Sequence, residues 1–238
     1  MPENLFKSDR TRFKQVNSFH ELLATPFANG INALCWQRTL PGDFAEIVRH
    51  VPNTGEDIAS LDDTWLAALS ATVTPAGRAA IDILLEDQRQ LREHGLSPTL
   101  DCIFSYTRDD QSPIPTHVQS FHIDTATVEA DTWLCTYHGP SSEGLPNEQA
   151  LRRVDIPETR ARLLELFGGE DNAAFREYLG ENCYDLHYLP APGAQPYIFG
   201  ISNLWRIATR YPGSPVPPCI HRAPETSPGD PPRLLLIA

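Results

Sequence analysis

The pattern of hydrophobic positions changes near Pro98. Before it, apolar residues recur at helical spacing, as in "SFHELLA" (18–24), which opens on a serine cap, and "GDFAEIVRHV" (42–51). The clearest helical pattern covers residues 75–95, with a proline near its start and a glycine at its end. We therefore predict a mainly helical portion in residues 1–97, with one strand in "INALCWQR" (31–38).

After Pro98 the apolar segments become short, rich in β-branched and aromatic residues, and bounded by Pro, Gly, Asn or Asp, which is typical of strands. A helical insertion interrupts them at about 146–180, where "NEQALRR", "PETRARLLELFG" and "NAAFREYLG" have helical patterns. The predicted strands are "TLDCIFSYTR", "THVQSFHIDTATV", "DTWLCTYHG", "YDLHYLP", "PYIFGIS", "CIHRAP" and "PRLLLIA".

Helices followed by a run of strands indicate an α+β protein with a β-sandwich or jelly-roll core. We expect one domain, in which the helical portion 1–97 packs on a core formed by residues 98–238. The length of 238 residues is compatible with this arrangement.

Charge and composition narrow the range of partners. The chain has 19 Lys and Arg against 31 Asp and Glu, a net charge of −12, and no basic cluster suited to a phosphate backbone, so we do not expect nucleic acid as a partner. Its apolar runs are shorter than the roughly 20 residues that span a bilayer, and its first residues lack the apolar centre of a signal peptide. We expect no membrane association and a cytoplasmic location.

The five cysteines are odd in number and form no CxxC pair, which argues against a disulfide framework and a zinc knuckle. We expect reduced thiols that are mostly packed.

The segment "SFHIDTAT" (120–127) contains the most specific chemistry. Side chains alternate along a strand, so His122 and Asp124 point to the same face. A His-x-Asp pair alone is a weak signal, but His221 and Arg233 follow in two later predicted strands. Two imidazoles and one carboxylate leave open positions on a metal, the arrangement suited to non-haem Fe(II) and O₂. The fork of an arginine matches a carboxylate.

The order "FHID", "HRAP", "PRLLLIA" resembles the Fe(II)/2-oxoglutarate-dependent oxygenases, which have a double-stranded β-helix, a jelly-roll or cupin-like core. Together with "LCTYHGPSSEGLPNE", it is also similar to an uncharacterised bacterial domain family. The resemblance covers about residues 100–238. It implies that His122, Asp124 and His221 bind Fe(II) and that Arg233 binds the distal carboxylate of 2-oxoglutarate.

The same resemblance makes Tyr137 a possible second donor to 2-oxoglutarate. It implies oxidation of a small-molecule substrate by O₂, with no catalytic residue beyond the metal ligands. The oxygenases often have a hydroxyl residue two positions after their arginine, whereas this chain has Leu235.

Further residues compete for roles at the site. His117, His138 and His187 lie in or near the same predicted strands, whereas His20, His50 and His94 fall in predicted helices. The insertion and the loop from Leu204 to Pro218 are expected to frame the pocket entrance, which makes Trp205 and Arg206 candidates for substrate contact. The sequence indicates neither the substrate nor an oligomeric state.

Two other functions stay open. A cupin-type metalloenzyme would use the metal without 2-oxoglutarate, as Leu235 allows. A non-catalytic jelly-roll protein would bind a metal or another ligand.

Overall fold

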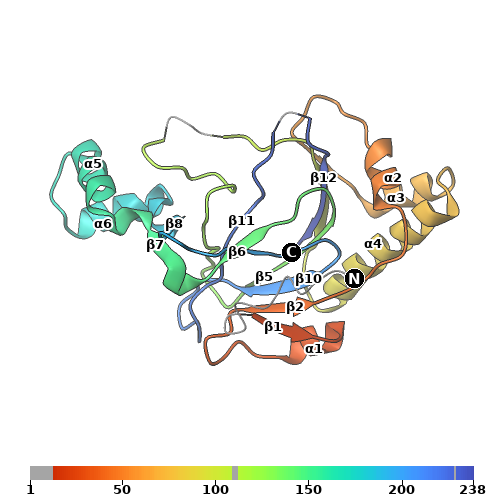
Figure 1. Ribbon diagram of the computed structural model, residues 1–238, viewed down its shortest axis with the longest axis horizontal. Helices are drawn as coiled ribbons and strands as arrows, with labels where there is room; N and C mark the ends of the chain where they lie inside the picture. Colours follow the sequence, from red (N-terminus) through yellow and green to blue (C-terminus); the bar gives the residue numbers. More distant parts are fainter. Residues whose placement is uncertain (1–12, 109–111, 228) are drawn as a thin grey trace.

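The computed structural model describes residues 13–108, 112–227 and 229–238. It is a mixed α+β structure with six α-helices in the described part of the chain and a large, mostly antiparallel sheet (Figure 1). The predicted α+β class is confirmed.

The large sheet has seven strands in the order β1-β2-β10-β5-β12-β4-β3. All neighbours are antiparallel except β1 and β2, which run parallel. Strands from the first part of the chain therefore extend both edges of a centre built from later strands. The strands are β1 (Phe13–Val16), β2 (Ala33–Trp36), β3 (Ile58–Ser60), β4 (Thr99–Ile103), β5 (Asp131–His138), β10 (Leu204–Ala208) and β12 (Arg233–Ile237).

Smaller groups of strands accompany this sheet. Three strands pair in the order β11-β6-β9, and β7 pairs with β8. The regular strand predicted in "THVQSFHIDTATV" is wrong: the segment around His122 forms only isolated bridges to His221 and His187, by which it is held between these groups. The strands are β6 (Glu143–Leu145), β7 (Ala150–Arg152), β8 (Tyr188–Pro190), β9 (Tyr197–Ile198) and β11 (Ile220–Arg222).

Four helices precede β4 and pack against one face of the large sheet, in a single apolar cluster with side chains of β5 and β12. Helix α4 is the helix predicted at 75–95: Pro75 opens it, and the Thr74 hydroxyl accepts a hydrogen bond from the Gly77 N–H at 3.1 Å. The Ser18 cap of the first helix and the strand at β2 are also confirmed. The helices are α1 (Phe19–Ala24), α2 (Phe44–His50), α3 (Asp63–Ser70) and α4 (Pro75–Glu93).

Strand β5 separates two apolar regions. Trp133, Cys135 and Tyr137 belong to the cluster on the helical side, whereas Leu134 packs on the other face with residues next to the three-stranded sheet, such as Phe199. This follows from the alternation of side chains along a strand. The face of β5 that carries Leu134 is therefore the face on which a site between the sheets would lie.

The insertion contains α5 (Pro157–Phe167) and α6 (Ala173–Glu181), which lie at the opposite end of the molecule from α2–α4 (Figure 1). The predicted helix in "NEQALRR" is wrong. Residues Asn147–Gln149 form a 3₁₀ turn and Ala150–Arg152 form strand β7, because pairing with β8 overrides a local preference for helix.

The five cysteines are free thiols, four of them buried, as predicted. Among the helices of the described residues, none combines the length and the apolar character needed to cross a membrane.

Candidate metal centre

The structure brings His122 and His221 together through their backbones. Each N–H donates to the carbonyl oxygen of the other residue at 2.9 Å, as in an antiparallel ladder. Directly opposite residues project from the same face, and the two ring centroids are 4.6 Å apart.

Each ring is oriented by a backbone carbonyl two residues earlier. Nδ1 of His122 lies 2.8 Å from the Ser120 oxygen, and Nδ1 of His221 lies 3.3 Å from the Cys219 oxygen. An Nδ1–H that donates to a carbonyl leaves Nε2 as the free lone pair, the usual arrangement of a metal-binding histidine. Both Nε2 atoms are therefore the available ligand atoms.

Asp124 completes the group. Oδ1 of Asp124 lies 3.9 Å from Nε2 of His122, and Oδ2 lies 3.7 Å from Nε2 of His221. Ligand atoms that each lie about 2.1 Å from one ion are at most about 4.2 Å apart, so both separations allow a shared ion. The ligand atoms of all three residues lie within 4.8 Å of one another. The predicted trio thus forms one possible metal-binding site.

Strand β5 fixes the carboxylate. The Thr132 hydroxyl donates to Asp124 at 2.5 Å and contacts the Thr209 hydroxyl at 3.2 Å. Burial would raise the pKa of Asp124, but His221, the Thr132 hydrogen bond and His122 together hold it below the usual value. The carboxylate is therefore ionised at neutral pH.

The imidazole of His122 is held neutral. Burial, with a smaller effect of His221, lowers the pKa of His122 to about 4. A neutral imidazole has no proton to lose before it binds a metal ion, so His122 is ready to act as a ligand at pH 7.

Arg233 is buried with hydroxyl partners only. Its guanidinium donates to Tyr106 at 2.8 Å, Thr136 at 2.9 Å and Ser142 at 2.7 Å, while Nε has no hydrogen-bond partner. Burial lowers the pKa of Arg233, and no carboxylate of the described residues pairs with it. A buried arginine without a carboxylate is costly unless an anion binds there.

Tyr137 is not brought to this site. Its hydroxyl donates to Asp87 of α4 at 2.6 Å, on the helical face of the large sheet. The neighbouring Thr136 points to the opposite face and contacts Arg233, so alternation along β5 separates Tyr137 from the residue with which the resemblance grouped it.

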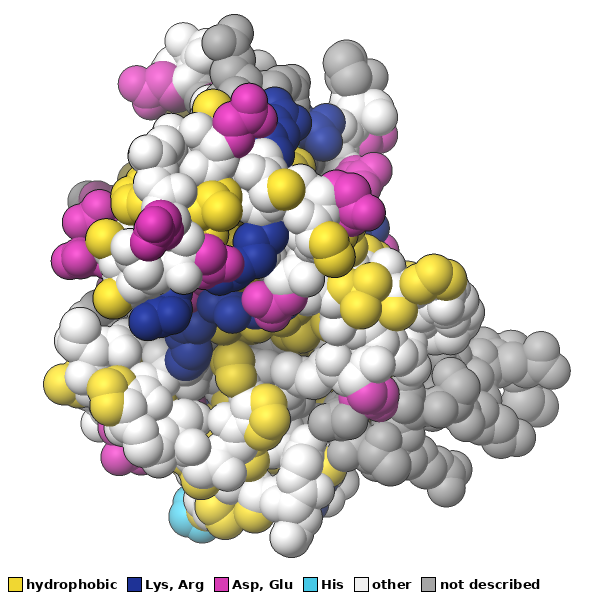
Figure 2. Space-filling model, turned by 90° about the vertical axis from the view of Figure 1, so that its left-hand side faces the viewer, with side chains coloured by type: hydrophobic (Ala, Val, Ile, Leu, Met, Phe, Trp, Pro, Cys, Tyr) yellow, Lys and Arg dark blue, Asp and Glu magenta, His cyan; other side chains and the backbone are white. Residues whose placement is uncertain are grey.

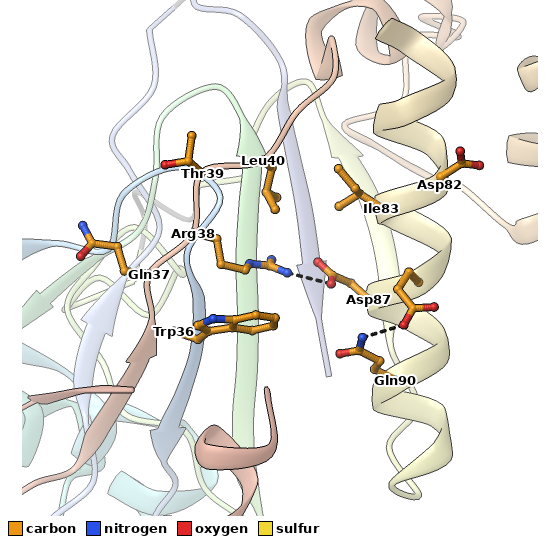
Figure 3. Close-up of a pocket in the computed structure, with 10 residues that line it drawn as sticks. Trp36, Gln37, Arg38, Thr39, Leu40, Asp82, Ile83, Asp87 and Gln90 are labelled. Atoms are coloured by element: carbon orange, nitrogen blue, oxygen red, sulfur yellow. Dashed lines mark hydrogen bonds and ion pairs between the residues drawn. The ribbon is translucent and has the colours of Figure 1, made fainter. Parts of the chain in front are cut away.

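Asp87 belongs to a separate polar network. Arg38, which follows β2, forms an ion pair with Asp87 at 2.7 Å beside a pocket of about 610 Å³ (Figure 3). Trp36 lies under the Arg38 guanidinium, whose carbon is 4.8 Å from the ring centre. This pocket lies between α4 and the segment after β2, on the helical side of the molecule.

The two residues predicted to contact the substrate, Trp205 and Arg206, instead make contacts that hold the fold together. Trp205 is buried, stacks on Phe199 with ring centroids 4.3 Å apart, and donates to the Phe199 carbonyl at 2.8 Å. Arg206 points to the other face of β10, where it pairs with Asp131 at 2.7 Å and donates to carbonyls at the end of α1. Trp205 is a packing residue between the sheets and Arg206 connects α1 to β10.

The other histidines differ in their position relative to the candidate metal centre. His94 is the C-cap residue of α4. Burial lowers the pKa of His138, with smaller effects of Asp43 and Arg49.

His187 is buried next to His122, with ring centroids 5.8 Å apart, and burial, with smaller effects of His122 and Arg153, lowers its pKa to about 3. His117 also lies near these rings, because its charge lowers the pKa of both His122 and His187. His187 and His117 thus extend the site.

Sequence reasoning missed the hydroxyl residues around the site. Thr132 holds Asp124, and Thr136 and Ser142 hold Arg233. The only local signal is the spacing of four between two threonines on one face of β5.

No protein-family model matches the chain, and neither the curated proteins nor the solved structures include a significant match. The fold and the site together define an α+β protein with a candidate centre of two histidines and one aspartate for a metal ion.

Proposed function

We propose that the protein is a non-haem Fe(II)/2-oxoglutarate-dependent oxygenase that oxidises a small molecule. His122, Asp124 and His221 would hold the metal, and Arg233 would hold the distal carboxylate of 2-oxoglutarate. Four observations support this proposal: the strand order, the donor set, the surroundings of Arg233 and the arrangement along β5.

The strand order fits a double-stranded β-helix. From β4 onward the chain passes from the large sheet to the His122 segment, back to β5, on to β6 and β9, back to β10, on to β11, and finally to β12. Alternation of this kind between a large and a small sheet is what a jelly roll requires. The order β4-β12-β5-β10 in the large sheet supports this fold for residues 98–238.

The donor set favours Fe(II). Two imidazoles and one carboxylate, with open positions on the metal, are the ligands of non-haem iron oxygenases. A structural zinc site would need a fourth protein ligand, and the group of ligand atoms found among the described residues comprises three residues only.

The surroundings of Arg233 support a bound carboxylate. The resemblance predicts a hydroxyl two positions after the arginine, where this chain has Leu235. Tyr106, Thr136 and Ser142 instead supply hydroxyls to Arg233 from three other segments. A carboxylate would provide the negative charge that this buried guanidinium lacks.

The observation that carries the proposal is the arrangement along one face of β5. Thr132 holds a metal ligand and Thr136 holds Arg233, with Leu134 between them. Thr132 and Thr136 are four residues apart in β5, so their side chains lie on the same face of the strand. The proposed metal site and the proposed carboxylate site therefore lie over one face of β5.

Bound iron with 2-oxoglutarate would supply the activation of O₂ for C–H oxidation. The chain's own residues position the reactants: the carbonyls of Ser120 and Cys219 orient the imidazoles, Thr132 orients Asp124, and Arg233 orients the diacid. Apolar side chains between the sheets, including Leu134 and Leu235, form a buried cluster that would limit the access of water to the bound reactants.

The test is anaerobic addition of Fe(II) to the purified protein, with visible spectra recorded before and after 2-oxoglutarate. We expect a weak charge-transfer band with 2-oxoglutarate. We expect no iron in His122→Ala, and iron without the band in Arg233→Met. Arg233→Lys, which keeps the charge but loses the fork, should give intermediate affinity for 2-oxoglutarate.

Other outcomes distinguish the alternatives. Iron binding with no band for wild-type protein at any 2-oxoglutarate concentration would favour a cupin-type metalloenzyme without this co-substrate. Unchanged iron content in His122→Ala would refute the proposed ligands. Tight stoichiometric zinc without O₂-dependent turnover would favour a non-catalytic metal-binding protein.

A further inference from the structure

Four basic side chains form a row across neighbouring segments of the backbone. His122 lies opposite His221 on one side and opposite His187 on the other. Strands β7 and β8 pair Arg152 with Tyr188, and the next pair in this register is Arg153 with His187, whose backbones are joined by a hydrogen bond of 2.9 Å. The row therefore runs from Arg153 through His187 to the metal ligands.

Arg153 lacks the acidic partner that comparable arginines have. Eight described arginines are not exposed, and six of them form ion pairs with Asp or Glu. The exceptions are Arg233 and Arg153. Nε of Arg153 is buried and has no hydrogen-bond partner, and burial lowers the pKa of the side chain. The neighbouring Arg152, by contrast, pairs with Asp185 at 3.2 Å.

His187 has an unsatisfied polar atom next to Arg153. The residue is only 4% exposed, and its Nδ1 has no hydrogen-bond partner. A buried polar atom without a protein partner is costly, so this nitrogen is available for a hydrogen bond with a bound group. The charge of Arg153 acts on the His187 imidazole, and the ring centroid of His187 lies 5.8 Å from that of His122.

Basic and acidic side chains are mixed on the side of the molecule near Arg153. The side of the molecule that bears α5, α6, β7 and β8 has Lys and Arg side chains gathered near its middle (Figure 2), although the net charge is −12. A guanidinium without an acidic partner, such as that of Arg153, attracts an anion.

We propose that Arg153 and His187 form a binding subsite for the acidic group of the substrate, which would be a small organic acid with a carboxylate or phosphate. This inference rests on the proposed function, because the metal centre beside His187 is where the substrate would react. The guanidinium provides charge and a two-pronged donor, and the imidazole provides one further hydrogen bond. The acidic group binds at one end of the row and the reacting part of the molecule lies toward His122.

The experiment is a titration of the metal-free, full-length protein with inorganic phosphate, followed by NMR of the histidine rings. The NMR signals of the His187 ring are assigned with the His187→Asn variant. They report phosphate that binds next to His187, and phosphate bound at Arg233 should not shift them. We expect phosphate to shift the His187 signals in wild-type protein. Arg153→Met should weaken this binding at least about tenfold, and Arg153→Lys should restore part of it.

Two control variants separate this subsite from other effects. Arg162→Met removes an exposed arginine of α5 and should leave phosphate binding unchanged. His122→Ala should abolish metal binding but keep the phosphate-induced shift, whereas Arg153→Met should keep the metal. Failure of the subsite and failure of the metal centre are therefore distinguishable.

The proposal would be overturned by either of two results. One is the absence of any shift of His187 with phosphate in wild-type protein. The other is equal affinity in wild-type protein and in an Arg153→Met variant whose circular dichroism and thermal unfolding match the wild type.

Discussion

At the scale of single residues, two threonines on one face of β5 contact the two proposed binding sites, one for the metal and one for 2-oxoglutarate. Thr132 donates to Asp124 and Thr136 accepts from Arg233. They share the strand, the face and the residue type, so they provide a matched pair of variants. If the two substitutions change ligand affinity differently, the difference reports which group each hydroxyl contacts.

We expect Thr132→Val to lower the affinity for Fe(II) about 10- to 100-fold, because the carboxylate of Asp124 loses the hydrogen bond that orients it. Thr136→Val should leave the metal affinity unchanged and weaken 2-oxoglutarate binding instead. Anaerobic competition with a chelator measures the first and titration of the charge-transfer band measures the second. Equal losses of metal affinity in both variants would contradict these assignments.

Thiol reactivity gives another prediction at this scale. Cys183 is exposed, whereas the other cysteines are buried, and burial raises the pKa of Cys35, Cys135 and Cys219 to about 12. Because the thiolate is the reactive form, the native protein should release one equivalent of chromophore from a disulfide reagent, and the unfolded protein five. Cys183→Ser should remove the native equivalent. Rapid reaction of a second thiol would show that a buried cysteine is accessible.

At the scale of elements, helix α4 is attached to the large sheet by a buried polar network. Asp87 of α4 accepts from Arg38 at 2.7 Å and from Tyr137 of β5 at 2.6 Å. The Arg38 and Asp87 side chains are 6% and 4% exposed, so neither charge is solvated when the other is absent. The network explains why Tyr137 contributes to the helix–sheet contact and not to the metal centre.

We expect Asp87→Asn to lower the free energy of unfolding by about 3–5 kcal/mol, because it leaves the charge of Arg38 buried without its partner. Asp82→Asn changes an exposed residue of the same helix that lines the same pocket, and should change stability by less than about 0.5 kcal/mol. Urea denaturation of the two variants tests the difference. A small effect of Asp87→Asn would mean that water replaces the carboxylate at Arg38.

At the scale of the whole molecule, the proposed metal ion would join segments that are distant in sequence. His122 and Asp124 precede β5, and His221 lies in β11, after the helical insertion. A ligand that binds only the folded chain stabilises it, by about 2.7 kcal/mol at a concentration 100 times its dissociation constant. The metal should therefore affect the stability of the complete fold.

We expect Fe(II) under anaerobic conditions, at about 100 times its dissociation constant, to raise the midpoint of thermal unfolding by about 5–10 °C. A chelator should reverse the rise. His221→Ala should show no rise, and Arg162→Met should respond like the wild type. An equal rise in His221→Ala would place the metal elsewhere.

Much of the local structure is predictable because its signals lie within a few residues. Ser18, Pro75 and the spacing of apolar residues determined where α1 and α4 begin, and the short β-branched segments determined most strands. "NEQALRR" shows the limit: its composition favours a helix, but pairing of β7 with β8 provides hydrogen bonds that a local pattern does not reveal.

The sequence by itself indicated the α+β class, the mostly buried free thiols and the grouping of His122, Asp124 and His221, because composition and the order of residues are properties of the chain. Only the tertiary structure decided which groups surround them. The register of β5 assigned Thr132 and Thr136 to one face and Tyr137 to the other. The pairing of β7 with β8 aligned Arg153 with His187. Such neighbours depend on hydrogen bonds between distant segments, and these form only when the whole chain has folded.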